Sequence, residues 1–509
     1  MLRYGVIICG TLEAWQSACL RNLDQSGVAK AAYVAQLPTQ EDYLVQLRSL
    51  ELDFCLLFGE LEAGLDLCSA AKYGTWYFAH SDLSVLESSV PGFWETYFSH
   101  DVVGAMLLKI TDGDSAGVIL KSAYLPIRRD SLEANVQAIF SALSGFPLSV
   151  CHDIQSGASG YLADAPIPRP PMRYGAPNRL QMLTVKLFRA KDRVIHMVGR
   201  EFYHEDWSVA HLAGSPSDYI GRDASARVVR VWPHAIGRYL ADPWVVSHDG
   251  KRYIFCEEFD YETDRGAVVV AELPWCDEPT SAAIEEPYHL SYPQIFEHDG
   301  VMFCIPESAQ ARNVCLYRAI AFPHRWQRVR TLIEDFSAVD STLVQFNGKW
   351  WLFCTSSETA ERGFNSHLYV WYADDLLGQW RQHAANPVKI DVRSSRPAGP
   401  FFTHDGRLYR PSQDCSRTYG GAICLNRIDK LTETDFKETV TGVIRPPAGR
   451  YSEGIHTISC AGSVCIVDVK RHAFYPRGFI AVLKCAAKSV ALRAGVSAHA
   501  LDALKKRYR

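Results

Sequence analysis

Apolar runs alternate with helix-periodic stretches along the first third of the chain. The runs Tyr4–Cys9, Ala29–Ala35 and Phe54–Phe58 are predicted strands, and the stretch from Leu12 to Leu23 has helical spacing. Uninterrupted apolar runs are typical of strands that are buried on both faces of a parallel sheet. Strands that alternate with helices therefore predict an α/β domain over residues 1–154.

The pattern breaks at residues 155–177, which are rich in Gly, Ser, Pro and Ala. Closely spaced prolines cannot sit inside a helix, so this stretch is a predicted linker between two domains. A helix is predicted from Asn178 to Lys191, followed by strands at Val194–Val198 and Trp207–Ala210. We interpret residues 178–234 as a connecting helix and strands.

A different pattern repeats over residues 235–484. Five short apolar hairpins follow one another about 50 to 60 residues apart, with further strand-like runs between them. The predicted turn pairs are Asp249-Gly250, Asp299-Gly300, Asn347-Gly348, Asp405-Gly406 and Ala461-Gly462. About four strands in each unit are typical of propeller blades, so we predict an all-β, five-bladed propeller. A two-sheet sandwich is the alternative, but it would not explain such regular hairpins.

Acidic residues stand at the open ends of these hairpins. Asp242 and Asp340 precede first strands, whereas Glu257, Glu258 and Glu307 follow second strands. The first strand of a blade begins beside the central channel of a propeller, so the acids are predicted to converge at one channel mouth. Several carboxylates in one cleft suit sugar chemistry, because neighbouring acids spread their pKa values and can divide the roles of acid and base.

The repeat also contains motifs that resemble known propellers. They are Ala-Asp-Pro at 241–243, Ser-Tyr-Pro-Gln-Ile-Phe-Glu-His-Asp-Gly at 291–300, Ile-Pro-Glu-Ser at 305–308, Arg-Pro-Ala-Gly-Pro at 396–400, Leu-Tyr-Arg-Pro-Ser-Gln-Asp-Cys at 408–415, and Glu-Gly-Ile-His-Thr at 453–457. The first resembles family-43 glycoside hydrolases. The others resemble the N-terminal propeller of glucosamine inositolphosphorylceramide transferases.

The hydrolase resemblance implies that Asp242 is the general base, and Glu307 and Asp340 are predicted to complete a catalytic set. Residues predicted to bind substrate are Arg396, Gln413, Asp414, Tyr419, Glu453 and His456. No metal is expected among them.

The segment from Gly74 to Leu125 resembles the formyltransferase domain, a Rossmann-type α/β fold. His80 in Trp-Tyr-Phe-Ala-His-Ser fits the family histidine, and the family aspartate would fall at Ser115 or Asp114. Phe78 stands where the family has an asparagine, and a phenyl ring cannot donate a hydrogen bond to an oxyanion. We therefore expect a degenerate formyltransferase site, used for binding or assembly, and no folate cofactor.

Composition and charge bound the setting of the protein. A hydrophobic content of 48% and a formal net charge of -4 are those of a soluble globular protein rather than a dedicated nucleic-acid binder. Fifteen cysteines without a C-x-x-C pair indicate buried thiols in a reduced compartment. We find no signal peptide and no run of 18 apolar residues, so a cytoplasmic location is expected. The basic C-terminal tail, residues 485–509, is the predicted point of peripheral membrane contact.

The leading hypothesis is a glycosyltransferase that builds an envelope polysaccharide or glycolipid, with a nucleotide-sugar or another activated sugar as donor. The acids of the propeller would carry the chemistry on a sugar or glycolipid substrate. Three alternatives stay open: an intracellular glycoside hydrolase of the family-43 type, a sugar-amine formyltransferase, and a non-catalytic glycan-binding scaffold.

Overall fold

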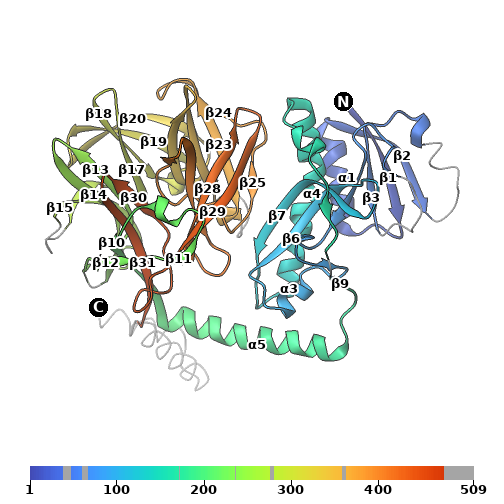
Figure 1. Cartoon of the computed structure of the whole chain (residues 1–509), viewed down its shortest axis with the longest axis horizontal. Coiled ribbons are helices and arrows are strands. Elements are labelled where there is room, and N and C mark those ends of the chain that lie inside the picture. Colours follow the sequence, from blue (N-terminus) through green and yellow to red (C-terminus); the bar gives the residue numbers. More distant parts are fainter. Residues whose placement is uncertain are drawn as a thin grey trace, which may run out of the picture.

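The chain folds into two domains that lie side by side above one long helix (Figure 1). The computed structural model describes residues 1–474 except 38–46, 60–66, 171, 236, 275–279 and 358–362. An α/β domain occupies the N-terminal part and an all-β domain the C-terminal part. The helix α5 (Arg179–Phe202) runs beneath both domains. The predicted Asn178–Lys191 helix is therefore confirmed, but it is longer than expected.

The N-terminal domain is built on a seven-stranded mixed sheet with the order β2-β1-β3-β4-β6-β7-β8. The first four strands in this order are parallel, as predicted, and the last three run antiparallel to their neighbours. The strands are β1 (Leu2–Cys9), β2 (Ala29–Leu37), β3 (Phe54–Phe58), β4 (Thr75–Ala79), β6 (Val102–Lys109), β7 (Ser115–Pro126) and β8 (Ile167–Pro168). A small parallel pair, β5 (Glu87–Ser88) with β9 (Arg173–Tyr174), and the short helix α3 (Phe93–Tyr97) lie outside the sheet order.

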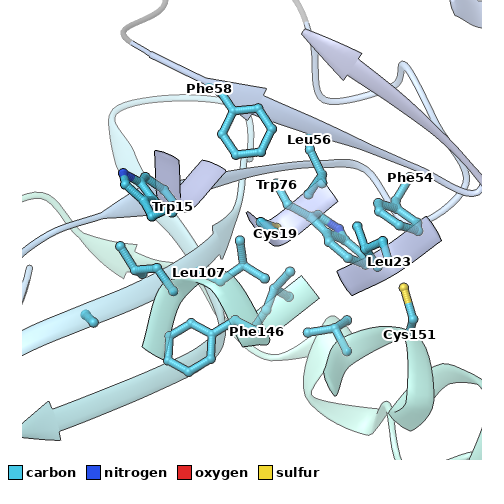
Figure 2. Packing of buried hydrophobic residues seen from close by; sticks show 14 of the residues in the cluster. Trp15, Cys19, Leu23, Phe54, Leu56, Phe58, Trp76, Leu107, Phe146 and Cys151 are labelled. Atoms are coloured by element: carbon cyan, nitrogen blue, oxygen red, sulfur yellow. The ribbon is translucent and has the colours of Figure 1, made fainter. Parts of the chain in front are cut away.

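Two helices, α1 (Ala14–Ser26) and α4 (Leu132–Ser156), pack on one face of this sheet. Figure 2 shows the resulting core, in which Phe54 and Trp76 stack with ring centroids 4.1 Å apart. By length and composition α4 could cross a membrane. Its apolar side chains, including Ile139, Leu143 and Phe146, are instead buried in this core.

The C-terminal domain consists of five sheets of four or five strands, which confirms the five-bladed propeller. Blades one to three contain β13 (Arg238–His248), β14 (Lys251–Asp260), β15 (Arg265–Leu273) and β16 (Ser281–Ile284); β17 (Ser291–His298), β18 (Val301–Glu307), β19 (Asn313–Ala321) and β20 (Arg325–Glu334); and β21 (Ala338–Phe346), β22 (Lys349–Ser356), β23 (His367–Ala373), β24 (Arg381–Gln382) and β25 (Lys389–Ile390). Blade four contains β26 (Phe402–His404), β27 (Arg407–Asp414), β28 (Ala422–Leu431), β29 (Phe436–Arg445) and β11 (Asp223–Ser225), and blade five contains β30 (Ile458–Ala461), β31 (Val464–Phe474), β10 (Tyr203–Leu212) and β12 (Val228–Val231).

Strands from the segment predicted as a connection close the ring. β10 pairs with β31 from Tyr203–Phe474 to Leu212–Cys465, and β12 lies on its other edge. β11 adds to blade four. The predicted strand at Val194–Val198 is wrong, because these residues continue α5. Val194, Ile195 and Val198 are spaced as well for a helix as for a buried strand, and short apolar runs leave that choice open.

The first four hairpin turns lie where the sequence predicts them. Both residues of each Asp-Gly or Asn-Gly pair have positive φ, for example 48° at Asp249 and 75° at Gly250, as type I′ turns require. The fifth turn is shifted by one residue, since Ala461 pairs with Val464 and the turn is Gly462-Ser463. Gly462 alone has positive φ there, which fits a turn with Gly at its first central position.

Cys460 and Cys465 face each other across this last hairpin and form a disulfide. The expectation of free thiols therefore fails for this pair. Nine further cysteines that the structure describes, among them Cys19 and Cys55, are buried thiols, as expected.

The two domains contact each other through β7 and the end of blade three. The backbone N–H of Val392 donates to the carbonyl of Tyr124 at 2.9 Å. The guanidinium of Arg393 lies 3.9 Å from the centre of the Tyr124 ring and pairs with Asp391. Ion pairs of Arg417 with Asp101 and of Lys437 with Asp164 add to this interface.

Candidate active site

Three blades carry a bulge near the start of their first strand, with positive φ at Asp242 (53°), Tyr292 (45°) and Asp340 (52°). In blade four, Gly399 (126°) has positive φ just before the first strand. In the first three blades the strand register shifts at the bulge, for example between Ala241 and Trp244. Non-glycine residues with positive φ are strained, and such strain tends to gather at functional sites.

The bulge turns backbone donors away from the strand ladder, and carboxylates from elsewhere in the ring accept them. The N–H of Asp242 donates to Asp468 Oδ2 at 3.0 Å, and that of Tyr292 donates to Asp242 Oδ2 at 3.3 Å. The N–H of Asp340 donates to Glu307 Oε2 at 3.0 Å. The acids therefore link consecutive blades.

The buried acids and their partners form one cluster on the axis of the propeller, which we call the axial cluster. One part of it, the imidazole half, consists of Asp242, His456, Thr457 and Asp468. His456 Nε2 lies 3.5 Å from Asp242 Oδ1, and its Nδ1 lies 2.6 Å from Asp468 Oδ2, in an electrostatic contact without hydrogen-bond geometry. Thr457 donates its hydroxyl to Asp242 Oδ1 at 2.8 Å. Trp207 stacks on the imidazole with ring centroids 4.0 Å apart, so the ring is held between two carboxylates and an indole.

Burial controls the proton affinity of the imidazole half. Burial raises the pKa of Asp242 to about 6; the charges of Asp340 and Asp468 act in the same direction, whereas His456 and Thr457 oppose them. Burial alone would lower the pKa of His456, but the carboxylates of Asp468 and Asp242 outweigh it and raise that pKa above its ordinary value. This half can therefore exchange protons near neutral pH.

The other part, the guanidinium half, consists of Asp340, Arg396, Gln413 and Tyr419. Arg396 binds both oxygens of Asp340, with Nε 2.6 Å from Oδ2 and Nη2 3.2 Å from Oδ1. Gln413 Nε2 donates to Asp340 Oδ2 at 2.8 Å, and Arg396 Nη2 also donates to the Tyr419 hydroxyl at 3.2 Å. The Asp340 carboxylate is thus compensated by a permanent cation.

Two glutamates couple the halves. Burial, followed by the charges of Asp242, Glu307 and Asp340, raises the pKa of Glu257 well above its ordinary value. Burial and the charge of Asp340 do the same for Glu307. Among the described residues none donates a hydrogen bond to Glu257 Oε1, and His289 Nε2 lies 3.5 Å away. Both glutamates are therefore suited to hold a proton at neutral pH.

Asp242, His456 and Asp468 could also hold a metal ion by distance alone, since one ligand atom from each lies within 4.8 Å of the others. Both imidazole nitrogens face carboxylate oxygens in this arrangement. A proton on His456 satisfies that geometry without an ion.

Most of the predicted propeller residues lie together, although their roles stay predictions. The structure gathers Asp242, Glu307, Asp340, Arg396, Gln413, Tyr419 and His456.

Asp414 and Glu453 lie elsewhere. Asp414 Oδ1 accepts the N–H of Ser416 at 2.9 Å, because alternation along β27 puts its side chain on the opposite face from Gln413. Glu453 is exposed, and its Oε2 lies 3.6 Å from His472.

Three residues that were not predicted from the sequence belong to the site or support it. Asp468 is an acid inside an apolar strand, and Trp207 covers His456. Lys470, fully buried, donates to the Tyr419 carbonyl at 2.6 Å. Asp468 and Lys470 stand at alternate positions of a buried strand. This pattern could have indicated the site, because charged residues are rarely buried without partners.

The N-terminal domain does not assemble a comparable site around His80. The His80 ring packs edge-on against Trp15 and Phe140, and its Nε2 is buried without a hydrogen-bond partner among the described residues. Phe78 stacks on Phe58. The Asp114 side chain is 99% exposed and faces Arg169, whereas the His80 ring lies among aromatic rings.

The fold and the site define a five-bladed propeller with a buried set of coupled carboxylates on its axis. Residues 232–451 match the family model described as glucosamine inositolphosphorylceramide transferase 1, N-terminal, which confirms the resemblance of the propeller. The protein of that name from Oryza sativa subsp. japonica is 36% identical over 209 residues, covering 39% of this chain and 27% of the relative. The Arabidopsis thaliana protein is 33% identical over 207 residues. This chain thus spans about a quarter of the length of these relatives.

Solved structures of glycoside hydrolases are also similar to the chain. The family 117 enzyme Zg3597 of Zobellia galactanivorans is 12% identical, with a TM-score of 0.34, and the match covers 52% of this chain and 90% of that one. The family 62 arabinofuranosidase domain of Coprinopsis cinerea is 13% identical, with a TM-score of 0.33, and the match covers 53% and 98%.

Proposed function

We propose that this protein is a carbohydrate-active enzyme, a glycosyltransferase that acts on a glycolipid, and that the axial cluster is its active site. The observation that carries the proposal is the buried cluster of acids: Asp242, Glu257 and Asp340 are buried together with Glu307, and burial raises the pKa of Asp242 to about 6 and those of the two glutamates well above the ordinary value. The names of the relatives matched by the propeller support a transferase.

Asp242 is the base in this proposal. At neutral pH a carboxyl group with a pKa of about 6 is mostly ionised, yet it accepts a proton more readily than an ordinary aspartate. It would take the proton of the acceptor hydroxyl as the new glycosidic bond forms. Thr457 fixes the carboxylate in place through its hydrogen bond to Oδ1.

Asp340 is not a free acid or base, since Arg396 and Gln413 occupy its oxygens. Its role in the proposal is to anchor Arg396 and Tyr419. The protons held by Glu257 and Glu307 would serve the departing group of the donor. Arg396 and His456 are committed to carboxylates, so neither is proposed to bind a phosphate of the donor.

A glycoside hydrolase is the second candidate, because the same observation favours it. Glycoside hydrolysis needs one carboxyl that holds a proton and one that is ionised and activates water. Glu257 and Asp242 meet that description. The two candidates differ in whether a sugar hydroxyl or a water molecule reaches Asp242.

The test is a pair of assays on the purified protein. One offers an activated glucosamine donor with inositolphosphorylceramide in detergent micelles, and the other offers nitrophenyl furanosides. We expect transfer, lowered by about 10²–10⁴-fold in Asp242→Asn, which keeps the shape but removes the base. Asp414→Asn is the matched control, because that residue caps a turn outside the cluster.

Rapid nitrophenol release that Asp242→Asn abolishes would replace transfer by hydrolysis. Equal turnover by the wild type and Asp242→Asn in both assays would remove the cluster from the chemistry altogether.

A further inference from the structure

The helix α5 carries a stripe of large apolar side chains that face solvent. Leu180, Leu183, Leu187 and Val194 are 72%, 51%, 62% and 56% exposed. Their spacing of three, four and seven residues puts them on one face of a helix. We call these four residues the α5 stripe.

The opposite face of α5 fixes the helix to the N-terminal domain. Val185 is buried in a cluster with Phe93 and Trp94. Arg189 pairs with Glu133 at 2.8 Å on the same side. At 100° per residue, the α5 stripe lies about 140–180° around the helix from Val185. The stripe therefore faces away from the N-terminal domain, and Figure 1 shows α5 along the lower edge of the molecule.

Cations flank the stripe on both sides. Arg179 and Lys186 lie on one flank and Lys191 on the other, and all three are exposed. The helix contains six Lys or Arg against two Asp or Glu, although the whole chain has a net charge of -4. An apolar stripe bordered by cations is the pattern of helices that lie in the plane of a membrane surface.

The sequence that follows the last described residue is also basic. Phe474, the last described residue, pairs with Tyr203, which directly follows α5. Residues 475–509 contain eight Lys or Arg against one Asp. The described end of the chain therefore lies beside the end of α5, and the sequence that follows it is basic.

We propose that α5 is a membrane-docking helix that inserts its stripe between the headgroups of an anionic bilayer. Charge complementarity favours anionic lipid as the partner of the stripe. The C-terminal segment and a second copy of α5 are both basic, so either would bring like charges together on the stripe, whereas anionic lipid neutralises them. The proposal names α5, in addition to the C-terminal tail, as the membrane contact. It does not depend on the chemistry of the axial cluster.

The experiment is co-sedimentation of the full chain with vesicles of phosphatidylcholine, with or without phosphatidylglycerol. We expect binding to the anionic vesicles that weakens at high salt. Leu183→Glu/Leu187→Glu should lower the bound fraction at least tenfold. Lys186→Gln/Lys191→Gln should weaken binding by roughly fivefold for each lysine.

The matched control is Val229→Glu, an equally exposed apolar residue on β12, which should bind like the wild type. Unchanged thermal unfolding would show that the variants fold, as expected for exposed positions. Binding that survives in Leu183→Glu/Leu187→Glu would assign it to the C-terminal segment and overturn the proposal. No binding by the wild type would also overturn it. In that case an elution volume that changes only in this double variant would identify a second copy as the occupant.

Discussion

The imidazole half and the guanidinium half of the axial cluster each contain an aspartate at the same position of a blade, but the two aspartates have different partners. Asp242 and Asp340 are both bulge residues with φ near 50°, both are buried, and the N–H of each is accepted by a carboxylate. They differ in their cation: Arg396 stays charged at every accessible pH, whereas His456 can lose its proton, although the carboxylates of Asp468 and Asp242 raise its pKa above the ordinary value. One scaffold position therefore gives a fixed ion pair in one blade and a proton-exchanging site in another.

The largest expected effect comes from breaking the fixed pair. Arg396→Ala leaves Asp340 buried without its cation, which costs about 3–5 kcal/mol of unfolding free energy. Urea unfolding followed by circular dichroism measures the loss.

The chain offers a matched control for this prediction. Arg445 and Asp223 form the same two-pronged pair, with both contacts at 2.7 Å, but they are half-exposed. Arg445→Ala should cost no more than about 1 kcal/mol. Equal losses in the two variants would show that burial does not distinguish them.

The hairpins of the propeller could be predicted from the sequence, whereas its closing strand could not. Asp-Gly and Asn-Gly turns have a local cause, so the hairpins and the blade count followed from them. Asp242 and Asp340 were found because they stand beside those hairpins. The closing strand β10 was placed in a connection, because its partner β31 lies more than 250 residues later and no local pattern encodes that pairing.

The contacts between side chains within the cluster could not be predicted from the sequence either. Nothing near Arg396 in the sequence says that its guanidinium binds Asp340, and Asp468 became visible only when β31 brought it beside His456. Glu453 had a prominent position in its motif, yet its side chain turns to solvent. Side-chain direction at a bulge or blade edge depends on register, which a single sequence fixes weakly.

The second-largest expected effect is the change of thermal stability with pH, which distinguishes the imidazole half from the guanidinium half. The pKa of Asp242 rises from 3.8 to about 6 on folding, so its contribution to stability is fully present below pH 3.8 and is lost as the pH rises through about 6. The pKa of His456 is also raised, so its contribution is present below 6.5 and is lost at higher pH. Thermal midpoints of the wild type should therefore fall between pH 4 and pH 8.

Asp242→Asn should flatten the acid part of this fall, because an amide does not titrate. A shift of that size corresponds to roughly 3 kcal/mol across the window. The part above pH 6.5 should remain, since the charge of Asp468 still raises the pKa of His456. A wild type that becomes steadily more stable from pH 4 to pH 8 would contradict the assignment of both pKa directions.

The smallest expected effect is at Glu257, which borders the imidazole half. Its pKa is raised well above the ordinary value, so at neutral pH folding must add a proton that the unfolded chain lacks. Glu257→Gln replaces a neutral acid by a neutral amide of similar shape and removes that cost. We expect a gain of about 1 kcal/mol at neutral pH and none near pH 4, where glutamate is largely protonated in both states. Glu272→Gln, at an exposed pair with Lys251, controls for the change of net charge and should show no such gain. Differential scanning calorimetry at the two pH values measures the difference. A loss of stability at neutral pH in Glu257→Gln would mean that the Glu257 carboxyl is ionised in the folded protein. The two halves would then interact through the charge of Glu257 and not through a proton that it holds.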